Sequence, residues 1–511
     1  MYRVATLVWV LLVCCGCAKS PLIRSSIASE MFENGPLKVC FVSGSFEYDS
    51  HTSLAVFKDY LEQSYNADCT LLKTDEWEDF PGLEALDECD VALFFTRRLR
   101  IDGEQLARVK RYCTSGRPVV AVRTASHGFQ NWLAFDKLVL GGNYQGHFGD
   151  GPTMKAEIVR GAKSHPVLDG VGPIMSRHSL YKTAPLAEDA QVLMAGSTPK
   201  SKGSQPVTWT RVYKGGRVVY TSLGGQQDFE NATFRRMLAN ALFWAAERKV
   251  ERAEEPPPPP LRPTPEGTMQ LHLRSRTETA TGSGVWAERF FDKAVPVAET
   301  AILICDMWDN HWCRGATERC DAIAKKMAPV INAARDSGVQ IIHAPSDTLG
   351  FYADRPQRRR MMLAPRVPLP KPLDLPDHPL PIDDSDGGCD TGDEVYGAWT
   401  RQNPRIDIGE YDGISDNGKE VYCFLKQLGI KNLIIMGVHT NMCVLGRSFA
   451  IRQMTRWGID CVLVRDLTDT MYDPNDAPYV SHDEGTELVV QHIEKYWCPS
   501  ILSDELVKGL P

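Results

Sequence analysis

The sequence predicts an α/β protein with two doubly wound domains, each built on a mainly parallel sheet flanked by helices. Three observations carry this prediction. Short apolar strands alternate with amphipathic helical patterns through residues 36–249, the same rhythm returns through residues 296–500, and a run of five prolines lies between the two. Each half is long enough to bury a full hydrophobic core.

Composition limits the classes of partner. Hydrophobic residues make up 43% of the 511 residues and charged residues 24%, which is ordinary for a soluble globular protein. A net charge of −8 argues against nucleic acid as the main partner, so we expect a small-molecule substrate. Three of the 15 cysteines lie within the first 17 residues, and the other twelve follow at irregular spacings that predict no small disulfide framework.

The N-terminal segment 1–17 has the pattern of a signal peptide, with one basic residue, an apolar run too short to span a bilayer, and then small residues. Gly16-Cys17 resembles a bacterial lipoprotein cleavage site, which implies that Cys17 is acylated, although Cys14 stands where Leu is usual. Cys15 is a second candidate, and ordinary secretion is the alternative. We therefore expect an exported protein, either a periplasmic or outer-membrane-anchored lipoprotein that meets the membrane only through its lipid, or a secreted one.

In the first half, the expected strands are "LKVCFVSG", "CDVALFFT", "RPVVAVRT" and "GGRVVYTSLGG". The expected helices are "SLAVFKDYLEQSY", "DGEQLARVKRYCTSG" and "NATFRRMLANALFWAAER", which carry apolar residues three and four apart. Further on, the sequence contains His51, "GGNYQGHFG" (with His147), "SHPVLDG" and "PVTWTRVYKGGRVVYTSLGG". On these points residues 36–249 resemble the ThuA-like (trehalose-utilisation) family. That resemblance implies a fold related to class I glutamine amidotransferases.

The same comparison argues against amidotransfer. Amidotransferases carry their nucleophilic cysteine after the strand that corresponds to "VVAVRT", where this chain has Arg123. The family's acidic "DE-x-Y" is replaced by "HSLY" and its "LGH" by "LGG". Three histidines expected at sheet edges, His51, His127 and His147, form either a carbohydrate or metal site or a set of loop-capping groups.

A linker is expected at residues 250–268, where "EEPPPPPLRPTPEG" favours a stiff polyproline II spacer. It separates the first half from a second α/β pattern.

Two strings of the second half carry the chemistry. The apolar strand "TAILIC" ends at Asp306, and "NLIIMGV" leads through a turn to Cys443 and a predicted helix, "VLGRSFAIRQMTRWG". Parallel strands deliver both residues to the ligand-binding edge of a sheet. A thiol at a helix N-terminus is expected to have a lowered pKa, and a neighbouring carboxylate can act as its base. A buried structural cysteine is the alternative.

Residues 296–500 resemble the isochorismatase-like cysteine hydrolases, the superfamily that includes nicotinamidases. The nucleophile of that family lies in a "G-V-x-T-x-x-C-V" turn, here Gly437 to Val444, and its first strand ends in Asp. The resemblance implies a cis peptide between Val438 and His439. It also implies an oxyanion hole formed by the backbone N–H groups of His439 and Cys443.

The family's third catalytic residue, a lysine about three dozen positions before the cysteine, is absent. Glu410 or a neighbour stands there, and the next lysine is Lys419. For the site to work, a cation must come from elsewhere. We nominate Arg401, Arg405 or His311, of which the arginines supply charge but cannot release a proton.

No metal or cofactor is predicted. Nicotinamidases carry an Asp-x-His metal site with a further histidine, whereas the corresponding stretch here offers only His343 and Asp347. Residues 352–400 form a long Pro-rich insertion, expected to be a lid, a partner surface or a disordered segment. Within it, "RPQRRR" is either an anion-binding or a solvated run, and "DDSDGGCDTGDE" does not fit an EF-hand loop.

The resulting hypothesis is an exported cysteine hydrolase that cleaves a small amide or related C–N bond through a thioester, with Asp306 as base and Cys443 as nucleophile. The ThuA-like half would be accessory and would bind carbohydrate. The alternative is a non-catalytic carbohydrate-binding or scaffold lipoprotein in which the missing lysine marks a dead site.

Overall fold

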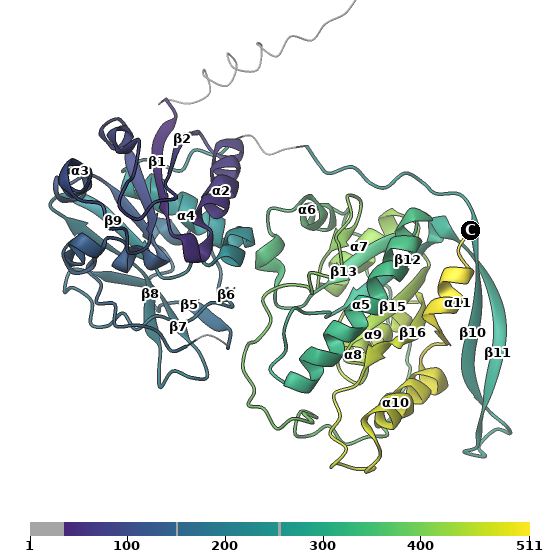
Figure 1. Ribbon diagram of the computed structural model, residues 1–511. Helices are drawn as coiled ribbons and strands as arrows, with labels where there is room; N and C mark the ends of the chain where they lie inside the picture. The colour runs from purple at the N-terminus through teal and green to yellow at the C-terminus, as the bar shows by residue number, and fades with distance from the viewer. Residues whose placement is uncertain (1–34, 150–151, 254–256) are drawn as a thin grey trace, which may run out of the picture.

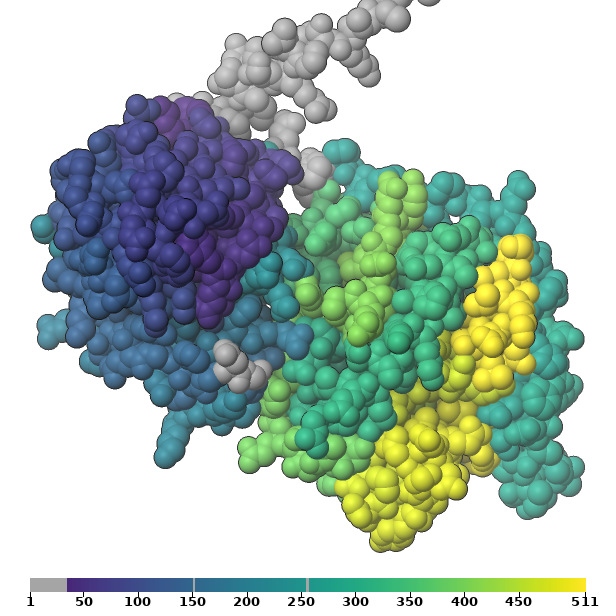
Figure 2. All heavy atoms as spheres, viewed as in Figure 1, coloured from purple at the N-terminus to yellow at the C-terminus, as the bar shows by residue number. Residues whose placement is uncertain are grey.

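The computed structural model describes residues 35–149, 152–253 and 257–511, which fold into two α/β halves in contact with each other (Figures 1 and 2). The predicted signal peptide and Cys17 lie outside the described residues. Among the helices that are described, none is both long and apolar enough to cross a bilayer.

The first half is built on a nine-stranded sheet in the order β2-β1-β3-β4-β9-β8-β7-β5-β6. Its strands are β1 Leu37–Gly44, β2 Ala67–Lys73, β3 Val91–Thr96, β4 Val119–Val122, β5 Met154–Ile158, β6 Ile174–Ser176, β7 Gln191–Ser197, β8 Gln205–Tyr213 and β9 Gly216–Thr221. Strands β1 to β4 and β9 run parallel, and of these β1, β3, β4 and β9 match the predicted strands whereas β2 was not predicted. Strands β5 to β8 extend the sheet as antiparallel strands.

Helices cover both faces of this sheet. Side chains of α2 (Ser50–Ser64) and α4 (Ala232–Ala245) share one buried cluster with the inward side chains of β1, and α3 (Gly103–Thr114) packs in the cluster on the opposite face. The alternation of β1 side chains between the two clusters is what a strand buried on both faces requires.

The second half contains an eight-stranded sheet in the order β11-β10-β17-β16-β15-β12-β13-β14. Its strands are β10 Thr268–Glu278, β11 Trp286–Pro296, β12 Thr300–Cys305, β13 Gln340–Ala344, β14 Gly413–Ile414, β15 Asn432–Val438, β16 Asp460–Asp469 and β17 Ser500–Ile501. All pairings from β17 to β14 are parallel, and the long hairpin β10–β11 adds an antiparallel edge (Figure 1).

Helices also sandwich the second sheet. Side chains of α5 (Arg314–Asp336) and α11 (Ser503–Lys508) pack with Ile302 and Ile304 of β12, whereas α7 (Gly418–Gln427) and α10 (His482–Tyr496) share a cluster with Leu303. Both faces of β12 are therefore buried, which fixes the strand end that carries Asp306.

The structure corrects the predicted helix after Cys443. Instead of one helix, the chain forms a single turn, α8 (Cys443–Gly446), and a short helix, α9 (Ile451–Arg456). Arg447 between them is extended, with φ −63° and ψ 154°. The amide of Gly418, the first residue of α7, donates to Ser448 Oγ at 3.0 Å, so a contact with the start of α7 holds the break.

The insertion at 352–400 packs along the second half. After α6 (Pro356–Met362) it continues without regular structure, and backbone hydrogen bonds join it to Arg456 and Ala477. Part of its basic run is engaged within the protein, because Arg358 is paired with Glu420 at 2.6 Å and Arg360 donates to backbone carbonyls, whereas Arg355 is exposed to solvent.

Candidate active site

Asp306 and Cys443 lie at the same edge of the second sheet. Asp306 follows β12 directly, and Cys443 follows its parallel neighbour β15 by a five-residue step. The two side chains are within hydrogen-bonding reach of each other. Adjacent parallel strands place their carboxyl ends together, so the fold brings the base and the thiol together as the sequence pattern predicts.

Gly437 allows the two strand ends to approach. Its φ is 120°, a conformation that side-chain-bearing residues rarely adopt, and a Cβ built there would lie 2.0 Å from the carbonyl oxygen of Cys305. Any larger residue would push β15 away from the strand that carries Asp306. The peptide bond that follows, between Val438 and His439, is cis.

The carboxylate of Asp306 is fully buried and held at both oxygens. Its Oδ1 accepts the backbone N–H of Ser346 at 2.7 Å, and its Oδ2 accepts Nε of Arg447 at 3.2 Å. Burial raises its pKa to about 6, opposed by the Arg447 charge and the Ser346 hydrogen bond. Asp306 is therefore a carboxylate at neutral pH but a stronger base than an exposed aspartate.

Cys443 is the one partly exposed cysteine among the described residues; the others are buried. Burial, followed by the charge of Asp306, raises the pKa of its thiol to about 12. The expectation of a lowered thiol pKa is therefore wrong for the ligand-free protein. A helix of one turn offers little macrodipole, and desolvation beside a carboxylate outweighs it.

One backbone N–H group contacts the sulfur of Cys443. The amide of His439 donates to that sulfur, while the amide of Val444 is occupied by the carbonyl of His439 at 3.1 Å. Burial lowers the pKa of the His439 imidazole to about 4, so this side chain is neutral at physiological pH.

None of the three nominated cations pairs with Asp306. Arg401 forms its ion pair with Glu230 of the first half, and Arg405 pairs with Asp321 at 2.7 Å. His311 stacks among aromatic rings, and burial lowers its pKa to about 3, so it carries no charge. Glu410 does not lie beside Asp306 either. It lines a cavity with Gly338 to Ile341 at the amino end of β13, whereas Asp306 and Cys443 lie at the carboxyl end of the parallel strands.

Arg447 is the cation beside the catalytic pair. Besides its bond to Asp306, its Nη2 lies 3.7 Å from Asp347 Oδ2, and Asp416 is a third acidic neighbour. Cys443 and Arg447 are four residues apart, a spacing that puts both side chains on one face of a helical turn, and the backbone N–H of Arg447 donates to the carbonyl of Cys443 at 3.0 Å. This spacing was the signal in the sequence that the nomination of Arg401, Arg405 and His311 missed.

Aromatic rings form a wall beside the pair. Trp308 stacks on Trp399 at 4.4 Å between centroids, His311 stacks on the same ring at 5.6 Å, and His311 meets His439 edge-on at 5.0 Å. Trp399 belongs to the insertion. The backbone N–H of the next residue, Thr400, donates to Asp309 Oδ1 at 2.9 Å. The insertion therefore forms part of the wall.

The first half touches this wall from outside. Thr153 Oγ1 donates to the carbonyl of Ala398 at 2.6 Å, and Arg177 lies 3.8 Å from Asp309. A cavity of about 370 Å³ lies between the halves, lined by Pro199 from the first and by His311 and Trp312 from the second. The two halves thus share the surroundings of the site.

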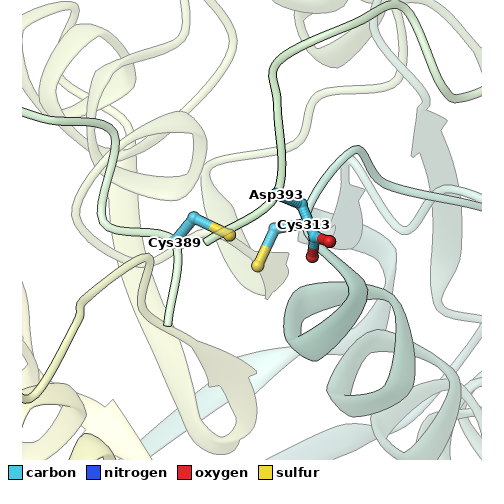
Figure 3. Close-up of side chains that lie close together, drawn as sticks. All are labelled: Cys313, Cys389 and Asp393. Carbon is cyan, nitrogen blue, oxygen red and sulfur yellow. The ribbon is translucent and has the colours of Figure 1, made fainter. Parts of the chain in front are cut away.

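The nicotinamidase-type metal residues are not assembled. Both ring nitrogens of His343 are engaged, Nδ1 with Gln402 at 2.8 Å and Nε2 with Asp412 at 2.9 Å. Within the described ranges, one group of three metal-capable side chains lies close together, and it consists of Cys313, Cys389 and Asp393 (Figure 3).

In the first half, the turn after β4 carries Arg123 at φ 47°, fully buried. Its guanidinium lies 4.6 Å from the ring of Tyr48 and 4.7 Å from that of Tyr181, and it donates to the carbonyl of Ser222 at 2.7 Å. Cys113 is buried on α3. The amidotransferase nucleophile position is thus filled by a structural cation.

The three histidines of the first half are not one cluster. His51 is held by Ser43 and the carbonyl of Thr74, whereas His127 stacks on Tyr144 at 4.4 Å. His147 pairs with Tyr181 through an isolated bridge. No three metal-capable groups come together there within the described residues.

The two departures from the ThuA pattern are linked in space. A Cβ at Gly225, the last residue of "LGG", would lie 1.6 Å from the ring of His178, the first residue of "HSLY". The ring of His178 therefore lies against the backbone of position 225 and excludes any side chain there.

Two family models match separate parts of the chain. The trehalose utilisation (ThuA) model matches residues 38–245, and the isochorismatase domain model matches residues 300–477. The fold and the Asp306–Cys443 edge define a two-domain α/β protein with a cysteine at a strand–helix turn. The chain joins a ThuA-like domain to an isochorismatase-family domain.

Solved structures with similar halves have low sequence identity. A ThuA-like protein from Parabacteroides merdae is 18% identical, with 44% of this chain and 94% of that chain covered and a TM-score of 0.36. A cysteine hydrolase from Pseudomonas syringae is 16% identical, covering 42% and 94%, with a TM-score of 0.29. An isochorismatase from Pseudomonas putida is 15% identical, covering 41% and 91%, with a TM-score of 0.26. A search of curated proteins found no match.

Proposed function

We propose that the second half is a cysteine hydrolase that cleaves a small amide or related C–N bond through a thioester on Cys443. The observation that carries this proposal is the contact of a buried carboxylate, Asp306, with both a thiol and a guanidinium at the carboxyl edge of the sheet. These three groups supply a base, a nucleophile and a positive charge.

In the proposed acylation step, Asp306 takes the thiol proton as sulfur attacks the carbonyl carbon. The raised thiol pKa means that thiolate forms only during attack, when the substrate has displaced water. The backbone N–H groups of His439 and Cys443 hold the oxyanion, and Asp306 then passes the proton to the departing amine. The product of this step is a Cys443 thioester.

In the proposed deacylation step, Asp306 takes a proton from water, which attacks the thioester carbonyl. The carboxylic acid leaves and the proton returns to the sulfur. Arg447 keeps Asp306 ionised between the steps, because a nearby positive charge favours the carboxylate.

The charged side chains around Asp306 and Cys443 favour a neutral or cationic substrate. Arg447 is surrounded by the carboxylates of Asp306, Asp347 and Asp416, so the local balance is acidic. The aromatic rings of Trp308 and Trp399 offer an apolar wall to the acyl group.

Ammonia release from a panel of neutral small amides, measured against pH, tests the proposal. We expect kcat/KM to rise with pH through about 6, because protonated Asp306 cannot accept the thiol proton. The neighbouring imidazoles of His439 and His311 have pKa values of about 4 and 3, so they do not account for a limb near 6.

The matched variant is Asp306→Asn, which should remove turnover and with it the pH limb. Failure of the wild-type chain to release an amine from any neutral or cationic amide would favour the alternative, a non-catalytic protein. Carbohydrate binding by the ThuA-like half stays a prediction of the sequence.

We also propose that the chain is an exported lipoprotein acylated at Cys17. Two or more acyl chains, at roughly 0.8 kcal/mol per buried CH₂, anchor a protein stably, so the mature protein should partition into detergent. Cys17→Ser should release the protein into the aqueous phase or block its processing. Wild-type protein found wholly in the aqueous phase would contradict the anchor.

A further inference from the structure

The cluster of Cys313, Cys389 and Asp393 lies outside the catalytic pair and has no role in the proposed reaction. One ligand atom from each residue lies within 4.8 Å of the others. Cys313 precedes the first turn of α5, whereas Cys389 and Asp393 come from the insertion (Figure 3). The two sulfur atoms point towards each other, so the fold brings together donors 76 positions apart in the chain.

Local contacts already fit a small tetrahedral centre. In a zinc site with Zn–S distances near 2.3 Å, two thiolate sulfurs lie about 3.8 Å apart, which is within the spread seen here. The hydroxyl of Thr391 lies 3.4 Å from Cys313 Sγ and 3.5 Å from Cys389 Sγ, and it donates to Asp393 at 2.5 Å. A single polar atom thus reaches all three donors, as an ion between them would.

The start of a long helix lies beside the cluster. The N-terminus of the long helix α5 points at the cluster, and the backbone N–H of Arg314 donates to Asp393 Oδ2 at 2.9 Å. Asp390, which Arg319 holds at 2.6 Å, accepts from Cys313 Sγ at 3.5 Å, so a further carboxylate borders the cluster.

We propose that Cys313, Cys389 and Asp393 bind one zinc ion, with solvent in the fourth position. Two thiolates and a carboxylate are ligands that Zn²⁺ accepts, and Ca²⁺ or Mg²⁺ would require oxygen donors instead. Cys313 is buried and Cys389 nearly so, whereas Asp393 is exposed, so an ion and its water can reach the cluster from the Asp393 side.

The ion would fasten the insertion to α5 near the catalytic edge. Met442, which precedes the nucleophile, packs against the same small apolar cluster as Cys313 and Cys389. The segment after Asp393 carries Trp399, so fixing Asp393 also restrains the aromatic wall. The role inferred for the zinc is structural, and it does not depend on turnover.

Zinc content of the full chain tests this proposal. The protein is purified with its thiols reduced, stripped with a chelator, reloaded with Zn²⁺, freed of excess ion and analysed for metal. We expect about one zinc per chain and an increased Tm on loading, because an ion that binds only the folded state stabilises it. Co²⁺ in place of Zn²⁺ should give a thiolate-to-metal charge-transfer band.

Cys389→Ser and Asp393→Asn should each weaken zinc binding at least 100-fold, and Cys389→Ser should remove the Tm increase. Cys320→Ser is the matched control, since Cys320 lies on α5 but outside the cluster, and it should keep the zinc. Equal zinc content in wild type and Cys389→Ser would overturn the proposal. So would a Cys313–Cys389 disulfide in a protein that binds no zinc when reduced.

Discussion

Replacing Cys443 by alanine should lower kcat at least about 10³-fold on every amide that the wild-type protein hydrolyses, because the change removes the atom that forms the thioester. The fold should survive. Cys443 is partly exposed and the substitution removes one atom, so we expect a loss of about 1 kcal/mol or less in the free energy of unfolding. Steady-state amine release and a thermal melt measure the two effects.

Mass spectrometry of the quenched reaction should find the acyl group on Cys443 and nowhere else. Cys461→Ala is the control, because Cys461 is a buried thiol of the same half near the start of β16, far along the strand from the catalytic edge. Cys461→Ala should retain turnover. If Cys443→Ala stays active, or if the adduct maps to another cysteine, the thioester mechanism is wrong.

Local pattern was sufficient to predict that Asp306 and Cys443 lie at one edge of a sheet. The apolar runs that become β12 and β15 are buried on both faces, so their ends, and with them Asp306 and the turn to Cys443, are specified by residues close in sequence. The two-domain α/β fold was predictable for the same reason. The antiparallel strands β5 to β8 were harder to predict from the sequence, because their pairing depends on neighbours far along the chain.

The electrostatics of the site were not predictable, because they depend on contacts that no short pattern encodes. Arg447 shares the turn of Cys443, but its partner Asp306 lies 141 positions earlier in the chain, so their ion pair depends on the fold. The thiol pKa is set by burial beside Asp306 rather than by the short helix. Cys313 and Cys389 meet only because the insertion folds back onto α5.

Arg447→Ala should move the acid limb of the pH profile upward. With the guanidinium gone, buried Asp306 loses the charge that favours its ionised form, and a nearby opposite charge is typically worth about one to three pKa units. The limb, near 6 in the wild type, should then lie between about 7 and 9, and kcat/KM at pH 7 should fall by about twofold for a shift of one pKa unit and about tenfold for a shift of two. Profiles of kcat/KM against pH for the two proteins measure the shift.

Arg447→Lys tests whether the site needs only a positive charge at this position or also the planar geometry of the guanidinium. An ammonium restores the positive charge but not the planar fork that reaches Asp306 through Nε and Asp347 through Nη2, so the limb should return towards 6 while kcat recovers only in part. Arg405→Ala is the control, since Arg405 is paired with Asp321, is half exposed, and should leave the limb unchanged. A merely structural arginine would lower kcat without moving the limb. An unmoved limb in Arg447→Ala would therefore show that Arg447 is not the group that replaces the family lysine.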